Sequence, residues 1–153
     1  GLEAAYGHWV APRPGLVDYR LLDPAQPNRL KLAPGLVLST GPMAHTPDSM
    51  AFRLAAGGRS VVYSGATGPT PHLVQLAQAA DLLIIESSMP EGMEVEGHLT
   101  PSLAGRIAAE AQVKKVILTH LYPETEGHDL LGPAQKEFSG PVIIAEDGLR
   151  LEV

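Results

Sequence analysis

The sequence contains six histidines, and two of them follow segments that have the pattern of β-strands. His45 comes a short loop after the apolar residues 36–39, and His120 directly follows the strand predicted for residues 115–119. Neutral imidazole offers a lone pair near pH 7, which makes histidine a frequent metal ligand in proteins. A histidine at the end of a strand is as often a plain surface residue, so the residues alone leave both interpretations open.

A second pair of ionisable residues, Glu86 and His98, stands between those two histidines in the sequence. Glu86 ends the apolar strand predicted for residues 82–86, and His98 lies in the loop before a helix that Thr100 is expected to cap. Histidine and glutamate are both residue types that enzymes use in general acid–base catalysis. The plain alternative is a loop histidine and a strand-end carboxylate that share no role.

The clearest motif is the sequence Ser-Gly-Ala-Thr-Gly at residues 64–68, which follows an apolar run at residues 61–63. It resembles the loop with which hydrolases of the metallo-β-lactamase fold present an aspartate that bridges two metal ions. Four further segments are similar, in matching order, to the ribonuclease Z branch of that family. They are residues 43–54, the His-Leu-Thr sequence at residues 98–100, residues 116–122 and the turn at residues 145–148. The resemblance extends from about residue 36 to residue 153.

The resemblance implies an α/β fold that is half of the αββα metallo-β-lactamase sandwich, with one mixed β-sheet and helices on one face. His45 and His120 match metal ligands of the family. The intact parent would use two divalent ions as cofactors, and zinc is the expected metal. His98 matches the histidine that acts as a proton donor near the leaving group, and Glu86 matches the carboxylate that supports it. The family has a histidine before that carboxylate where this sequence has Ile85.

The family's His-x-His-x-Asp-His signature is absent from the sequence, and Ala66 occupies the position of the bridging aspartate. We therefore interpret the chain as the C-terminal half of such a hydrolase, with residues 1–34 a Pro-rich connecting segment and residues 35–153 the half-domain. Zinc sites usually have three or more protein ligands, so we expect little or no metal and no activity in this chain by itself. Three origins of Ala66 stay open: an engineered change, a natural loss, or the ordinary residue of a different family.

The rest of the pattern predicts alternating strands and helices. Apolar runs and turn residues place strands at residues 17–22, 36–39, 51–54, 60–63, 82–86, 115–119 and 142–145, and residues 149–153 as the second strand of a closing hairpin. Gly57 and Gly58 predict a tight hairpin turn, which leaves no room for the inserted arm with which ribonuclease Z enzymes grip tRNA. Thr70 and Thr100, each followed by proline, are expected to cap two helices. Residues 1–6 have the pattern of a helix end, and residues 133–138 that of a short helix.

Three of the predicted strands are continuously apolar rather than alternating, at residues 82–85, 116–118 and 142–144. Such strands are typically covered on both faces of a sheet, and the predicted helices can cover only one face. The second face therefore requires a partner, which is the missing N-terminal half of the domain or a second copy of the chain in a homodimer. A non-catalytic self-associating or binding module derived from this fold is the alternative to the hydrolase.

The 153 residues carry 11 Lys and Arg against 17 Asp and Glu, a formal charge of −6. That balance provides no electrostatic footprint for nucleic acid, so we favour a small phosphodiester or ester substrate for the parent, with nucleic acid a less favoured partner. No apolar run approaches the roughly 20 residues of a membrane span, and no cysteine is present, so the cytoplasm is the default location. His8, His72 and His128 match no motif and are interpreted as surface or helix residues.

Overall fold

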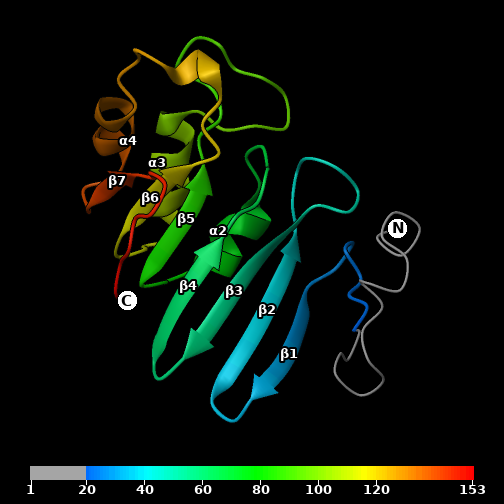
Figure 1. Ribbon diagram of the computed structural model, residues 1–153. Helices are drawn as coiled ribbons and strands as arrows, with labels where there is room; N and C mark the ends of the chain where they lie inside the picture. The colour runs from blue at the N-terminus through cyan, green and yellow to red at the C-terminus, as the bar shows by residue number, and fades with distance from the viewer. Residues whose placement is uncertain (1–19) are drawn as a thin grey trace, which may run out of the picture.

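The computed structural model describes residues 20–153, in which seven strands form one mixed sheet (Figure 1). The strands lie in the sheet in the order of the sequence: β1 (Asn28–Ala33), β2 (Leu36–Pro42), β3 (Met50–Ala56), β4 (Arg59–Tyr63), β5 (Leu82–Glu86), β6 (Val116–Thr119) and β7 (Val142–Ile144). The later strands are connected by α2 (Pro71–Ala77), α3 (Pro101–Glu110), the short 3₁₀ helix η2 (Pro123–Thr125) and α4 (Leu131–Glu137). The predicted α/β class with one mixed sheet is confirmed. In residues 20–153, no helix has the length and apolar character needed to cross a membrane.

The directions of the strands bring five loops to one edge of the sheet. β1 to β4 are antiparallel neighbours, whereas β4 to β7 run parallel to one another. The carboxyl ends of β2, β4, β5, β6 and β7 therefore lie at the same edge, where open α/β sheets bind their ligands. The loops that follow these ends are called the site-end loops below: residues 43–49, 64–70, 87–100, 120–130 and 145–148.

β3 and β4 are joined by the two-residue turn predicted from Gly57 and Gly58. These glycines have φ values of 57° and 78°, and positive φ at both central positions is the geometry of a type I′ turn. Glycine adopts it without steric cost because it has no Cβ. Ala56 and Arg59 pair directly across the turn, so no arm is inserted between the two strands.

The two predicted helix caps differ in how they are made. The side-chain oxygen of Thr70 caps α2 by accepting a hydrogen bond from the N–H of His72. Thr100 occupies the cap position of α3 but makes no such bond. The carboxylate of Glu91 instead accepts hydrogen bonds from the N–H and the hydroxyl of Ser102, at 2.8 and 3.0 Å. Glu91 thus anchors its own loop to α3, where a negative charge is favourable.

The two faces of the sheet are covered unequally. Strand residues that point toward the helices form a buried core with them, and its members include Val62, Leu73, Ala77, Leu83, Ile85, Ala104, Ile107, Val116 and Leu118. On the opposite face, the side chains of Leu54 and Tyr63 are 42% and 46% exposed. Because successive strand residues alternate between faces, this difference confirms helices on one face only. The described residues leave the other face partly open.

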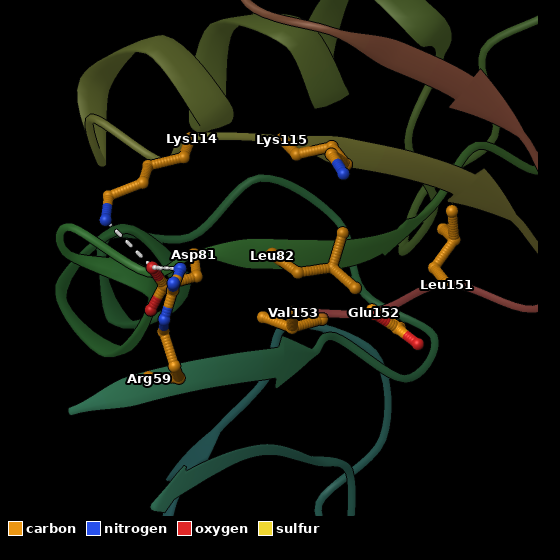
Figure 2. A pocket seen from close by; sticks show the side chains of 8 residues that line it. All are labelled: Arg59, Asp81, Leu82, Lys114, Lys115, Leu151, Glu152 and Val153. Carbon is orange, nitrogen blue, oxygen red and sulfur yellow. Dashed lines mark hydrogen bonds and ion pairs between the residues drawn. The ribbon is translucent and has the colours of Figure 1, made fainter. Parts of the chain in front are cut away.

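The C-terminal tail covers a part of that open face. Residues 149–153 form no strand, and the only neighbour of β7 among the described strands is β6, so the predicted closing hairpin is wrong. After the turn at residues 145–148 the chain returns across the sheet instead of alongside β7. Leu151 and Val153 line a pocket of about 210 Å³ together with Leu82 of β5 (Figure 2), and Leu82 is buried there.

The first strand of the sheet was not predicted from the sequence. β1 lies inside the Pro-rich segment and pairs with β2, from Asn28 opposite Thr40 to Ala33 opposite Leu36. Pro27 and Pro34 flank this strand rather than interrupt it, and prolines are tolerated at the limits of an edge strand. The strand predicted at residues 17–22 is absent from residues 20–22. Residues 17–19, the helix end predicted at residues 1–6, and His8 lie outside the described residues, and the domain division after residue 34 stays a prediction.

Candidate active site

The structure gathers three of the predicted site residues into a cluster of imidazole rings. His45 lies in the loop after β2, His98 in the loop after β5, and His120 directly after β6. His98 is the central member, because its ring centroid is 4.9 Å from that of His45 and 5.8 Å from that of His120. The parallel strand arrangement produces this meeting of residues that are far apart in the sequence.

Glu86, the fourth predicted site residue, is the hydrogen-bond partner of His98. Its side chain is fully buried, that of His98 is 9% exposed, and Nδ1 of His98 lies 3.1 and 3.3 Å from the two carboxylate oxygens. The hydroxyl of Ser88 donates to Glu86 Oε2 at 2.6 Å, and the N–H groups of Thr67 and Leu99 donate at 2.5 and 3.1 Å. These donors offset the cost of burying a carboxylate. Since Nδ1 faces Glu86, Nε2 is the ring nitrogen of His98 that is left for a substrate.

His45 is oriented by the backbone of the loop that carries His98. Its Nδ1 lies 3.1 Å from the carbonyl oxygen of Gly97, an arrangement in which Nδ1–H donates to that oxygen and Nε2 keeps its lone pair. Gly97 has a φ of 83°, and a Cβ at this position would lie 3.0 Å from Nδ1 of His45. The close approach therefore requires glycine.

His120 has an unusual backbone conformation and an aromatic neighbour. Its φ is 55°, in the left-handed region that residues other than glycine seldom adopt. Its ring lies edge-on to that of Tyr122, with centroids 5.2 Å apart and an interplanar angle of 76°. Tyr122 also lies 5.5 Å from the ring of His98. Strained residues of this kind concentrate at functional sites.

The loop at residues 64–68 connects the histidine loops to Glu86. The N–H of Thr67 donates to Glu86, and its hydroxyl oxygen accepts a hydrogen bond from the N–H of Ala44 at 3.0 Å. Gly68 forms an isolated bridge with Ala44, one residue before His45. Within this framework Ala66 contributes only a methyl group, which can neither coordinate a metal nor donate a hydrogen bond.

The described residues do not provide the ligand set of a resident metal. In residues 20–153 no group of three or more His, Asp, Glu or Cys side chains is arranged to hold an ion. His45 and His120 are the two imidazoles that the sequence motifs match to metal ligands, whereas His98 is held through Nδ1 by Glu86. Two donors without a carboxylate between them are fewer than zinc sites use. The two histidines fit part of a metal site and do not complete one.

The remaining histidines that the structure describes lie apart from the cluster. His72 in α2 and His128 in the loop after η2 are both exposed, in agreement with their interpretation as surface or helix residues. Sequence reasoning assigned no role to Thr67, Ser88 and Tyr122, although all three contact the predicted site residues. The signal was present, since each stands within two residues of a position that was singled out.

Comparison with known proteins places the chain in a family. A family model described as a beta-lactamase superfamily domain matches residues 16–121. An uncharacterized protein of Mycobacterium leprae is 35% identical over 134 residues, and a ribonuclease Z of Archaeoglobus fulgidus is 39% identical over 136 residues. These alignments cover 86% and 85% of this chain, and 45% and 44% of the two relatives. The chain therefore spans less than half the length of these relatives.

Solved structures show the same fold. The metallo-beta-lactamase fold protein YhfI from Bacillus subtilis matches with a TM-score of 0.78 and 27% identity, over 96% of this chain and 61% of that protein. The short form of human tRNase Z matches with a TM-score of 0.64 and 23% identity, over 81% of this chain and 46% of that protein. The resemblance found in the sequence motifs is thereby confirmed. The chain belongs to the beta-lactamase superfamily and has the metallo-β-lactamase fold.

Proposed function

We propose that this chain forms the leaving-group side of a metal-dependent hydrolase that cleaves phosphodiesters or esters. The observation that supports the proposal most directly is the buried His98–Glu86 pair, which lies between the rings of His45 and His120. Membership of a superfamily that includes ribonuclease Z relatives supports the hydrolase class.

His98 is the proton donor in this proposal. Glu86 holds Nδ1, so a protonated ring presents its Nε2–H to the substrate, and the departing alkoxide takes that proton as its bond breaks. The carboxylate holds Nδ1 and so fixes the orientation of the ring. Ser88 and two backbone N–H groups hold the carboxylate in turn. Ile85 stands where ribonuclease Z enzymes have a histidine, and this departure favours a general hydrolase over a faithful tRNA-processing enzyme.

In a complete domain of this family, His45 and His120 would coordinate divalent ions, and zinc is the expected metal. Such ions polarise a phosphoryl oxygen or an ester carbonyl and lower the pKa of bound water. The described part of this chain supplies only these two donors, with Ala66 at the bridging position. We therefore propose that the chain is inactive by itself and that the remaining ligands come from the part of the family domain that it does not contain.

A small phosphodiester or ester is the substrate that the chain favours. Several relatives are named ribonuclease Z, which makes RNA the competing substrate. The direct Gly57–Gly58 turn between β3 and β4 leaves no arm that could grip a tRNA. The formal charge of −6 also opposes a polyanionic partner.

The test compares leaving groups in the product of the complete reading frame, with the bridging carboxylate restored by Ala66→Asp. His98→Ala should then lower the rate about 10²–10⁴-fold for a poor alkoxide leaving group, the usual effect of general acid catalysis. It should matter much less for a bis-aryl phosphate, whose leaving group departs without a proton. An equal loss for both substrates, or a parallel loss of bound metal, would contradict a role in proton donation.

A non-catalytic self-associating module is the second candidate, and the partly open face of the sheet favours it. Leu54 and Tyr63 are 42% and 46% exposed there, and removing their remaining apolar surface from water would be favourable. Two copies that pack these faces about a two-fold axis would form a closed dimer, with an obligate interface of about 2,000 Å² or more. Light scattering at micromolar concentration tests this: a dimer favours the module, and a stable monomer with a cooperative melt excludes it.

A further inference from the structure

The site-end loops have a charge distribution that the histidine cluster alone does not explain. These five loops, all within the described residues, contain nine carboxylates and no Lys or Arg; the carboxylates are Asp48, Glu91, Glu94, Glu96, Glu124, Glu126, Asp129, Glu146 and Asp147. The ten described Lys and Arg residues all lie elsewhere in the molecule. Three of them, Arg59, Lys114 and Lys115, line the pocket at the opposite edge of the sheet (Figure 2).

Carboxylates line two hollows that border His45 and His120. A hollow of about 660 Å³ is bounded by His45, Gly68 and Gly97, with Glu96 in its wall. A second hollow of about 300 Å³ is bounded by His120 and Thr119, with Glu146 and Asp147 in its wall. Any substrate that reaches the cluster through either hollow therefore passes close to a fixed negative charge.

Glu96 and Glu146 are free to act on a passing substrate. Both are exposed, and neither carboxylate makes a hydrogen bond or an ion pair with a described residue. Glu91, by contrast, is engaged by Ser102, and Glu94 accepts a hydrogen bond from the N–H of Gly92. No described residue therefore neutralises the charges of Glu96 and Glu146.

We propose that Glu96 and Glu146, with the other site-end carboxylates, exclude polyanions from the histidine cluster and restrict it to small substrates that carry at most one negative charge. The proposal rests on the proposed hydrolytic function of that cluster, because it names which substrates the cluster can admit. A nucleic-acid strand carries a phosphate at each nucleotide, so repulsion accumulates along it, whereas a single phosphodiester experiences little.

The experiment measures binding, so it does not depend on hydrolysis. Anisotropy of a fluorescein-labelled oligouridylate is followed as the protein is added at several salt concentrations. Binding to the unmodified chain should be absent. Glu96→Lys and Glu146→Lys should each produce measurable binding that weakens with salt, with a slope of about −0.7 in log K against log salt for each new phosphate contact. Glu110→Lys, at the end of α3, changes the net charge equally and serves as the matched control.

Each outcome decides the proposal. Binding that appears in Glu96→Lys and Glu146→Lys and not in Glu110→Lys supports it. Salt-sensitive binding by the unmodified chain would overturn it, as would equal gains in all three variants, which would show an effect of net charge alone. A lack of binding in every variant would also overturn it, because removal of the carboxylates would then not admit the strand. Failure of the proposed function is a separate result, namely that the Ala66→Asp protein hydrolyses neither class of ester.

Discussion

Asp81 and Glu86 stand at the two ends of β5, and they are stabilised in different ways. Asp81 accepts a hydrogen bond from Lys114 Nζ at 2.8 Å and from the N–H of Ser60 at 2.8 Å, and Arg59 lies 3.5 Å away. The bonds from Lys114 and Ser60 lower the pKa of Asp81 to about 2. Figure 2 shows Asp81 and Lys114 joined in this way. Among the described residues, Glu86 has no Lys or Arg partner; it contacts an imidazole, a hydroxyl and two backbone N–H groups.

The different partners give the two carboxylates different roles: Asp81 is structural, and Glu86 supports the proposed proton donor. Permanent cations keep Asp81 ionised over the whole physiological range, so it can hold β4, β5 and the turn before β6 together but cannot exchange a proton. Glu86 is instead paired with an imidazole, whose Nδ1 lies 3.1 Å from Oε1. The same strand thus ends in an ion pair with exposed cations at one edge and in a buried carboxylate–imidazole pair at the other.

Removal of Glu86 should cause the largest loss of stability among the variants considered. Glu86→Ala leaves the donors on Thr67, Ser88, His98 and Leu99 without their acceptor in a buried place, so the free energy of unfolding should fall by about 3–5 kcal/mol. Denaturant titration measures the change. Glu86→Gln retains one acceptor oxygen and should lose less. A loss below about 1 kcal/mol in Glu86→Ala, the value of one ordinary hydrogen bond, would contradict a central role for this carboxylate.

Substitution of Gly97 tests whether its close contact with His45 orients the imidazole ring. Gly97→Ala places a Cβ 3.0 Å from Nδ1 of His45 in a left-handed conformation, whereas Gly92→Ala meets nothing within 4 Å at a similar φ of 85°. Both variants should lose about 1–2 kcal/mol from backbone strain, visible as a lower melting temperature. Only Gly97→Ala should also shift the imidazole resonances of His45. Unchanged His45 resonances in both variants would show that the contact does not orient the ring.

Asp81 should show the smallest effect, because Lys114 and Arg59 are 68% and 63% exposed and solvent screens the pairs. A depressed pKa means that Asp81 stabilises the fold above its ordinary value of 3.8 and that this stabilisation is lost as the pH falls to about 2. Asp81→Asn should therefore be less stable than the unmodified chain at pH 7. The gap should close between pH 4 and pH 2 in thermal melts. A gap that stays constant over this range would contradict the ion-pair account.

Local signals in the sequence were sufficient to predict much of the fold. The Gly57–Gly58 turn, the Thr70–Pro71 helix start and the apolar runs of β5 and β6 each depend on neighbouring residues, and all are present in the structure. β1 was missed because its few apolar residues stand among prolines, and pairing with β2 is what makes it a strand. Residues 149–153 were wrongly predicted to be a strand. Their alternating apolar pattern reflects packing on a face of the sheet rather than pairing with a neighbouring strand.

Site residues that belong to a sequence motif could be predicted, whereas residues that only come close to the site in the folded chain could not. His45, His98, His120 and Glu86 were named from their segments, and the structure places them together. The contacts of Ser88 and Tyr122 depend on how two loops fold against each other, which no local pattern encodes. The charge difference between the edges of the sheet likewise becomes visible only when the strand directions show which loops share an edge.

We propose, as described above, that the chain holds a positioned proton donor beside an incomplete metal site. Elemental analysis of the purified chain after gel filtration is the most direct test, because no group of three or more His, Asp, Glu or Cys side chains in residues 20–153 is arranged to hold an ion. We expect well under one equivalent of zinc or manganese per chain. A content of about two metal ions per chain would contradict it.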